Sequence, residues 1–291
     1  MTLRLLAVHA HPDDESSKGA ATDAYYLSRG ARVMVVSCTG GEAGSILNDG
    51  LDARHHADRD IAGLRRHEMN RARQKLGIEH RWLGFSDSGL PDEGESIAAN
   101  SFAALPVQVA AEPLVRLVRD FRPHVIVSYD ENGGYPHPDH IRAHEVTMRA
   151  WEASADPSQY PDAGEPWLIS KFYYDRTFNG ERARAMRDAL RAALPDAPIT
   201  GALDEMIARW DLRGSDATTH IECAEFFDVR DAALRSHASQ VAPDSAFFFW
   251  PNDIQRDAWP YEDFLLAHSR VESTLPENDL FAGIIDEETV A

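Results

Sequence analysis

The first 175 residues alternate between two patterns of apolar positions. Short apolar runs, several of them rich in β-branched residues, are typical of buried strands, and between them apolar residues recur every three or four positions, as in amphipathic helices. Strands are predicted at 3–9, 31–38, 80–85, 124–129 and 169–174. Helices are predicted at 15–30, 58–77, 106–123 and 141–153, with Pro113 expected to kink or restart the third.

This alternation predicts an α/β fold: a Rossmann-like, mostly parallel sheet with helices on both faces. The last third is less regular, with helical patterns over 180–212 and 226–240, an alternating segment at 217–223, and an irregular aromatic stretch at 242–260. No repeat or low-complexity linker divides the chain. We therefore expect one domain over 1–291, in which 1–175 form the α/β core and 176–291 form a C-terminal α+β region.

The charge of the chain restricts its partners. Lys and Arg number 29 against 48 Asp and Glu, so the net charge is −19. A chain this acidic would be repelled by nucleic acid and by an anionic membrane. Two cysteines are too few for a disulfide framework, and no apolar run approaches the roughly 20 residues of a spanning helix. These features favour a cytoplasmic protein with a small-molecule substrate; they do not indicate an oligomeric state.

Two polar clusters follow buried strands. HAHPDDE follows the strand 3–9, and YPHPDH, residues 135–140, follows the strand 124–129. Ligands of open parallel sheets bind beyond the carboxyl ends of the strands, where both clusters are expected. A single His-x-x-Asp pair is more typical of a helix cap or surface loop, but so much charge beside buried strands is costly unless a cation pairs it. Two histidines and a carboxylate suit catalytic zinc or ferrous iron.

The same segments carry a resemblance. HPDDE (11–15) and HPDH (137–140) resemble motifs of the PIG-L/LmbE-like family of metal-dependent N-deacetylases and amidases. The similarity covers nearly the whole chain and includes SSKGAAT (16–22), CTGGEAGSI (38–46), LRRHEMNRARQKLG (64–77) and GFSDSG (84–89). The ordered set is far more specific than HPDD alone.

Matched position by position, the resemblance implies a ligand set and a base. His11, Asp14 and His140 would hold Zn2+, with Fe2+ as the alternative ion, and Asp13 would take a proton from the metal-bound water. The chemistry agrees, because zinc lowers the pKa of its water to about 7 and a neighbouring carboxylate can complete the deprotonation. Ordinary solvated loop acids are the alternative explanation of Asp13 and Asp14.

Three residues of the second cluster also have implied roles. His137 corresponds to the group that stabilises the tetrahedral oxyanion or protonates the leaving amine. Asp139 would orient a histidine, and the hydroxyl of Tyr135 would add to the oxyanion pocket, although an aromatic loop residue more often simply packs.

Substrate contacts are implied at three further positions. Arg65 and Asp87 match residues that hold the sugar of a glucosaminyl-inositol substrate, although an arginine on a helix is usually solvated. Lys18 would contact the cysteinyl side of the substrate. His237 is a candidate for the pocket wall, and the C-terminal region is expected to complete the pocket.

The resemblance therefore implies a metal-dependent hydrolase that acts on a linear amide bond. The implied substrate is a mycothiol S-conjugate, cleaved to a mercapturic acid (an S-substituted N-acetylcysteine) and glucosaminyl-inositol in actinobacterial detoxification. Two alternatives stay open: deacetylation of N-acetylglucosaminyl-inositol in mycothiol biosynthesis, and a paralogue that processes thiol adducts in natural-product biosynthesis. A nucleotide-binding or inactive module is disfavoured, because the first strand-turn lacks G-x-G-x-x-G and every expected ligand is present.

Overall fold

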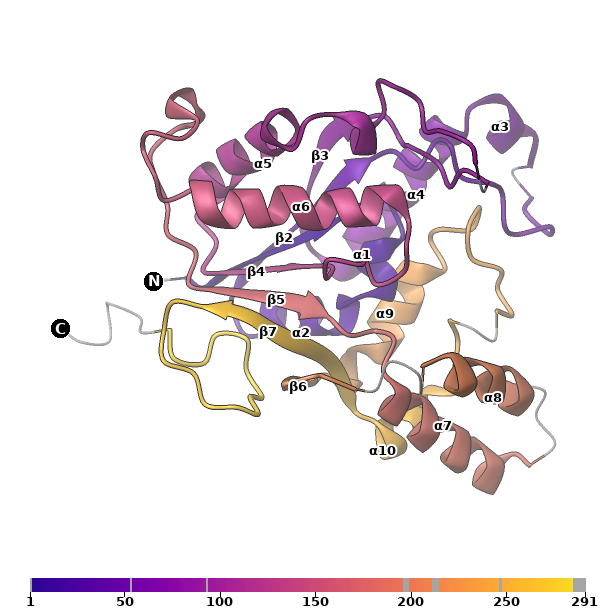
Figure 1. Cartoon of the computed structure of the whole chain (residues 1–291). Coiled ribbons are helices and arrows are strands. Elements are labelled where there is room, and N and C mark those ends of the chain that lie inside the picture. Colours follow the sequence, from indigo (N-terminus) through magenta and orange to yellow (C-terminus); the bar gives the residue numbers. More distant parts are fainter. Residues whose placement is uncertain are drawn as a thin grey trace.

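A central sheet organises the molecule (Figure 1). The computed structural model describes residues 2–52, 54–92, 94–195, 199–210, 215–245 and 248–284. Within this part of the chain, seven strands form one sheet in the order β3-β2-β1-β4-β5-β7-β6. The strands are β1 (Arg4–His9), β2 (Arg32–Thr39), β3 (Glu79–Phe85), β4 (Val125–Ser128), β5 (Lys171–Asp175), β6 (Thr219–Glu222) and β7 (Tyr261–Ser269).

The direction of the strands confirms the predicted α/β fold. The five strands from the first 175 residues run parallel, whereas β7 is antiparallel to both β5 and β6. β1 lies at the centre, where Leu5 pairs with Val33 of β2 on one side and with Val125 of β4 on the other. Such strands are apolar almost throughout because helices cover both of their faces.

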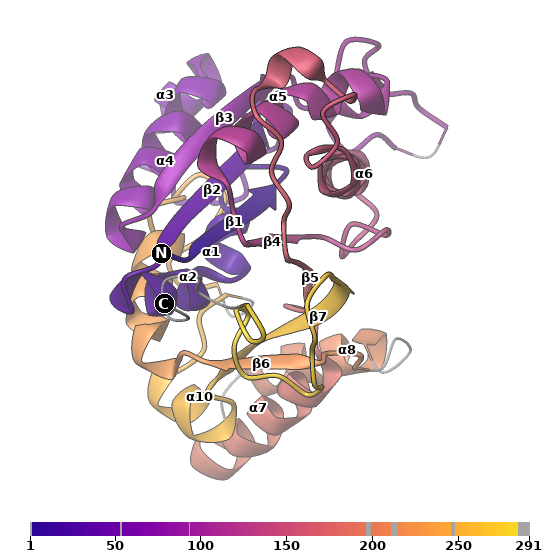
Figure 2. The ribbon, with the colours of Figure 1, turned by 90° about the vertical axis from the view of Figure 1, so that its left-hand side faces the viewer.

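The helices lie on both sides of the sheet (Figure 2). They are α1 (Asp14–Ser17), α2 (Ala20–Ser28), α3 (Arg54–Arg59), α4 (Ile61–Leu76), α5 (Val107–Phe121), α6 (Pro138–Ala153), α7 (Gly180–Ala193), α8 (Ile199–Trp210), α9 (Phe227–Leu234) and α10 (Asn252–Ala258). Successive β1 side chains alternate between two cores: Leu6 and Val8 pack with α5 and α6, and Leu5 and Ala7 pack with α2, α4 and α9. No helix in the described part of the chain has the length and apolar character needed to cross a bilayer.

Several predicted boundaries were wrong. The segment 58–77 contains the end of α3 and all of α4, because the side chain of Asp60 accepts a hydrogen bond from the Gly63 N–H and starts α4 there. The segment 15–30 also divides into two helices, the described residues of 180–212 contain α7 and α8, and α5 continues through Pro113 as one helix. α10 forms within the stretch predicted to be irregular.

Two differences bear directly on the site. α6 begins at Pro138 rather than at residue 141, so HPDH belongs to the start of a helix and not to a loop. β7 was not predicted, because Glu262 and Asp263 interrupt its apolar pattern; both side chains are buried. Through β7 and β6, the C-terminal region extends the same sheet, and α7, α8 and α10 lie beyond that end of it (Figure 1).

Candidate functional site

The two polar clusters meet because the strands before them are neighbours. β1 and β4 pair in parallel, so the loops after His9 and after Ser128 leave the same edge of the sheet. His11 and Asp139 are 128 positions apart in the sequence, yet His11 Nε2 lies 3.4 Å from Asp139 Oδ2. His137 caps α6: its Nδ1 accepts a hydrogen bond from the Asp139 N–H at 3.1 Å. The structure thus brings the predicted residues of both clusters together.

His11, Asp14 and His140 form a group that fits a metal ion. One potential ligand atom of each lies within 4.8 Å of the others, and all three side chains are buried. His140 Nδ1 lies 3.1 Å from the carbonyl oxygen of Gly133, which only accepts, so the proton is assigned to Nδ1. The lone pair on Nε2 therefore faces Asp14 Oδ2 at 3.4 Å.

The contact between His140 and Asp14 is unfavourable without a cation. His140 Nε2 is buried and has no hydrogen-bond partner in the described part of the chain. Burial also lowers the pKa of His140 well below its ordinary value, which keeps the ring neutral. Two facing electron pairs repel each other, whereas a divalent ion between them would accept both. The donor set therefore fits zinc or ferrous iron.

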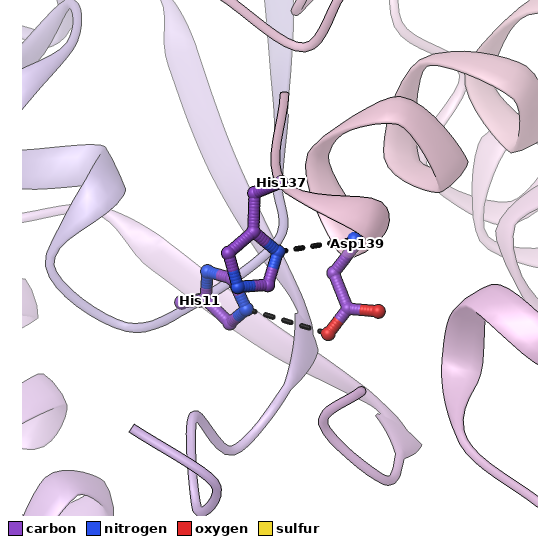
Figure 3. Close-up of side chains that lie close together, drawn as sticks. All are labelled: His11, His137 and Asp139. Carbon is purple, nitrogen blue, oxygen red and sulfur yellow. Dashed lines mark hydrogen bonds and ion pairs between the residues drawn. The ribbon is translucent and has the colours of Figure 1, made fainter. Parts of the chain in front are cut away.

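A second group shares His11 (Figure 3). It contains His137 and Asp139, with the His11 and His137 ring centroids 4.6 Å apart. Asp139 is fully buried, and its Oδ2 also accepts a hydrogen bond from the Ser88 N–H at 2.9 Å. Because Oδ2 is already hydrogen-bonded and faces His11 Nε2, Asp139 has the geometry of a residue that orients His11.

Asp14 is held by groups other than the histidines. Lys18 Nζ lies 2.5 Å from Asp14 Oδ1, and the Tyr129 hydroxyl donates to Asp14 Oδ2 at 2.8 Å. Burial alone would raise the pKa of Asp14, but the Lys18 ammonium holds it well below its usual range. Tyr129 was missed in the sequence because it ends an apolar run and looks like an ordinary core residue. Lys18, which was predicted as a substrate contact, therefore contacts Asp14, a candidate metal ligand.

Asp13 faces the cavity from a strained backbone. Its φ of 111° is rare for a residue other than glycine. Arg65 Nη2 lies 3.0 Å from Asp13 Oδ2, whereas Oδ1 has no hydrogen-bond partner among the described residues. The carboxylate is 24% exposed, which leaves it open to a ligand. Burial raises the pKa of Asp13, against the lowering effect of Arg65.

Arg65 and Asp87 organise the loops at one end of the site. Arg65 is 3% exposed, not solvated, and donates to the carbonyl oxygens of Gly41 at 2.7 Å and Pro12 at 2.6 Å. Asp87 accepts from the N–H groups of Ala43 and Gly89. Both side chains also line the cavity. They can therefore hold the loops and contact a polar ligand at the same time.

His237 does not line the cavity, although it was a candidate for its wall. It is fully buried behind the HPDDE loop, with Nε2 2.7 Å from Glu15 Oε1. The other oxygen of Glu15 accepts a hydrogen bond from the Asp13 N–H at 2.8 Å. The only sequence signal for this contact was the presence of Glu15 within the motif. The contact ties the strained Asp13 backbone to the C-terminal region.

His11, Asp13, Asp14 and His137 line one cavity of about 490 Å3, whereas His140 and Asp139 are buried behind its wall. Tyr135 stands in its wall, 38% exposed, with its ring centroid 4.5 Å from that of His140. From His11 and Asp14 the cavity continues to Arg182 of α7, Trp250 and β7 in the C-terminal region. A volume of this size accommodates a drug-sized ligand.

Known proteins resemble this chain over most of its length. The family described as PIG-L, GlcNAc-PI de-N-acetylase, matches residues 6–151. A Streptomyces coelicolor protein named mycothiol S-conjugate amidase is 49% identical, covering 98% of each chain. A Streptomyces scabiei protein named 1D-myo-inositol 2-acetamido-2-deoxy-alpha-D-glucopyranoside deacetylase is 38% identical, covering 97% of this chain and 90% of that protein.

A solved structure shares the fold. N,N'-diacetylchitobiose deacetylase from Pyrococcus horikoshii superimposes with a TM-score of 0.59 at 17% sequence identity, over 90% of this chain and 82% of that chain. The likeness in fold agrees with the family match and with the two full-length relatives. The chain therefore belongs to the PIG-L family of de-N-acetylases and amidases, hydrolases that act on amide bonds.

Proposed function

We propose that this protein hydrolyses the amide bond of mycothiol S-conjugates. The products are an S-substituted N-acetylcysteine and glucosaminyl-inositol. The observation that carries the proposal is the length of the cavity, which continues past His11 and Asp14 into the C-terminal region. A deacetylase needs room for only a methyl group on the acyl side of the amide, whereas a thiol conjugate needs room for a substituted cysteine. The Streptomyces coelicolor relative, which is named mycothiol S-conjugate amidase, supports the same choice.

The proposed metal ligands are His11, Asp14 and His140. Their support is the unpartnered Nε2 of His140, which faces Asp14 Oδ2 at 3.4 Å. Zinc bound there would supply Lewis-acid chemistry, polarising a carbonyl oxygen and making water easier to deprotonate. Ferrous iron prefers the same kind of ligands, so metal analysis has to count both ions. Asp139 is proposed to keep His11 oriented through its contact with Nε2.

Asp13 is proposed to be the general base. Its Oδ1 has no hydrogen-bond partner in the described residues, so that atom is available to take a proton from water. The bond forms between the water oxygen and the carbonyl carbon, and the electron pair of the C=O bond moves onto oxygen. The C–N bond then breaks, and the proton held by Asp13 is available to the leaving nitrogen.

His137 and Tyr135 are proposed to stabilise the oxyanion. Nδ1 of His137 accepts from a backbone N–H, so the neutral ring carries its proton on Nε2. Burial and the neighbouring His11 lower the pKa of His137, which favours this neutral form. An Nε2–H group can donate to the developing negative oxygen, and the Tyr135 hydroxyl supplies a second donor. Lys18, Arg65 and Asp87 are proposed as substrate contacts because all three line the cavity.

A second candidate function is deacetylation of N-acetylglucosaminyl-inositol. It is favoured by several relatives that are named 1D-myo-inositol 2-acetamido-2-deoxy-alpha-D-glucopyranoside deacetylase. Their sequences are between 37% and 39% identical to this chain. Both substrates share the sugar, the inositol and the position of the amide. They differ in the acyl group, and the long cavity favours the larger acyl group of the amidase substrate.

A direct comparison of the two substrates tests the proposal. Metal-replete protein is assayed on a fluorescent bimane conjugate of mycothiol and on N-acetylglucosaminyl-inositol, with the Asp13→Asn variant as the control for contaminating activity. The proposal expects kcat/KM to favour the conjugate by at least about tenfold, because only the conjugate fills the cavity. Preference for the acetylated sugar would establish the second candidate instead. Inactivity on both substrates with metal bound would contradict both.

A further inference from the structure

The far end of the cavity, away from Arg65 and Asp87, lies in the C-terminal region. Its walls come from α7, α9, α10 and β7, together with the segments beside them. The residues that we group as the Arg182 chamber are Phe178, Arg182, Arg230, Trp250, Gln255 and Phe264. Aromatic rings supply much of its wall, and two arginines and a glutamine supply its polar atoms. None of these residues has a role in the reaction proposed above.

Arg182 is the unusual member of this group. Its guanidinium carbon lies 5.0 Å from the centre of the Trp250 ring. Its Nε is buried, and its side chain has no hydrogen-bond or ion-pair partner among the described residues. Gln255 Nε2 is likewise buried and without a partner there, in a side chain that is 1% exposed. Unpaired buried donors are costly in a folded protein unless a ligand pairs them.

The nearby carboxylates of Asp263 and Glu262 accept hydrogen bonds from other donors and not from Arg182. Asp263 accepts from Asn179 at 2.8 Å and from Trp259 at 2.9 Å, and lies 2.7 Å from His220 Nδ1. Glu262 accepts from the first N–H groups of α2.

Arg230, in contrast, already has partners. Its Nη2 donates to Asp231 at 2.8 Å and to Gln255 Oε1 at 3.2 Å. This second bond orients the Gln255 amide. Among the described residues, Arg182 and the Gln255 amide nitrogen therefore remain as the donors of the chamber without a hydrogen-bond acceptor.

The strands that lead to the two ends of the cavity, β3 and β7, lie on opposite sides of β1, which the HPDDE loop follows. Asp87 follows β3, at one end of the sheet order, whereas Phe264 belongs to β7, beyond β5 at the other end. The loop with His11 follows β1, between them. A sugar and an inositol suit the polar end, because Arg65 and Asp87 can hydrogen-bond to their hydroxyl groups. The acyl side of the amide then points towards the chamber.

We propose that the Arg182 chamber binds the group carried on the sulfur of the conjugate. It favours groups with an apolar or aromatic body that end in an acceptor oxygen, a carbonyl or a carboxylate, hydrogen-bonded to Arg182. This inference rests on the proposed function for the identity of the substrate. The Gln255 amide is a second donor to the same oxygen.

Three matched S-benzyl conjugates of mycothiol test the inference: unsubstituted, para-acetyl and para-carboxy. Arg182→Gln removes the guanidinium, and Arg191→Gln is the control on the same helix, because Arg191 pairs with Asp204 in an exposed ion pair and does not line the cavity. The wild type is expected to favour the acceptor-bearing conjugates by on the order of tenfold in kcat/KM, mainly through KM. Arg182→Gln should abolish that preference and leave the unsubstituted conjugate within about twofold; Arg191→Gln should change neither.

Equilibrium binding separates this inference from the proposed function. The three corresponding S-benzyl-N-acetylcysteines are titrated into the wild type and both variants by calorimetry, which needs no turnover. If the para-acetyl and para-carboxy ligands bind equally well and both bind more tightly than the unsubstituted one, a neutral acceptor is sufficient. If the para-carboxy ligand binds most tightly, the chamber prefers an anion. Either result supports the inference when Arg182→Gln abolishes the tighter binding. Equal binding of all three ligands, or a preference that survives in Arg182→Gln, would overturn the inference. Loss of conjugate hydrolysis with the binding order intact would instead contradict the proposed function alone.

Discussion

His237 Nε2 lies 2.7 Å from Glu15 Oε1, a contact between two fully buried side chains that are 222 positions apart. Glu15 in turn accepts a hydrogen bond from the N–H of Asp13, whose φ is 111°. The rare backbone conformation of the proposed base is therefore supported from the C-terminal region. This arrangement makes the HPDDE loop dependent on a residue far outside the motif.

Removing His237 should destabilise the fold. His237→Ala removes the imidazole from Glu15 and leaves the buried carboxylate with only the Asp13 N–H and the Ser16 hydroxyl as donors. Breaking such a buried pair costs about 3–5 kcal/mol. The free energy of unfolding in urea measures the loss. His237→Gln is the matched variant, because its amide can still donate to Glu15, and it should lose clearly less. Equal stability of His237→Ala and the wild type would show that the contact contributes nothing to folding.

Removing the carboxylate of Asp13 should separate catalysis from metal binding. Asp13→Asn keeps the size of the side chain and its contact with Arg65 but cannot take a proton at Oδ1. We expect kcat to fall by about 10²–10⁴-fold while the metal content stays near that of the wild type. Steady-state kinetics and elemental analysis on the same preparation provide both values. A variant with near-normal kcat would remove Asp13 from the role of base.

His140 should be required for metal retention. His140→Ala removes the unpartnered Nε2 that faces Asp14, and a tridentate site that loses one ligand binds its ion more weakly. His144→Ala is the control on the same helix: His144 Nδ1 lies 3.0 Å from the Tyr129 carbonyl oxygen, and His144 belongs to neither of the metal-binding groups. Zinc and iron are counted per chain after dialysis. Equal metal content in both variants would exclude His140 as a ligand.

His80, a residue of β3 outside the site, should make the fold less stable in mild acid. Burial lowers the pKa of His80 from 6.5 to about 4, and its Nε2 lies 3.0 Å from Ser37 Oγ. Between these two pKa values the unfolded chain binds a proton that the folded chain does not, so the free energy of unfolding decreases as the pH falls. The full effect is at most about 3 kcal/mol, because His80 is only partly buried.

Urea unfolding at about pH 7 and about pH 5 measures this loss in the wild type and in His80→Gln. The glutamine does not titrate, so the wild type should lose roughly 2 kcal/mol more than the variant over this interval. Other titrating groups affect both proteins alike and cancel in the comparison. An identical pH dependence in the two proteins would contradict the assignment to His80.

Local patterns were enough to predict much of the fold. β1 and β2 were recognisable because strands buried on both faces are almost continuously apolar. The grouping of HPDDE with HPDH followed from the same pattern, since parallel strands end at one edge of the sheet. Exact helix ends were not predictable, because they depend on single caps such as Asp60 for α4 and His137 for α6.

The amino-acid sequence by itself determined the α/β core, the edge at which polar residues gather, and the residue types capable of holding a metal ion. Those features depend on local apolar periodicity and on the chemistry of individual side chains. Only the tertiary structure decided that β7 joins the sheet despite Glu262 and Asp263, and that His237 supports Glu15. It also decided that Arg182 lies beside Trp250 with its Nε buried and without a hydrogen-bond partner in the described part of the chain. Each of these facts depends on which distant groups become neighbours. From the sequence alone a charged residue is expected to be solvated. Whether it is buried, and whether it then has a partner that makes its burial favourable, depends on the fold.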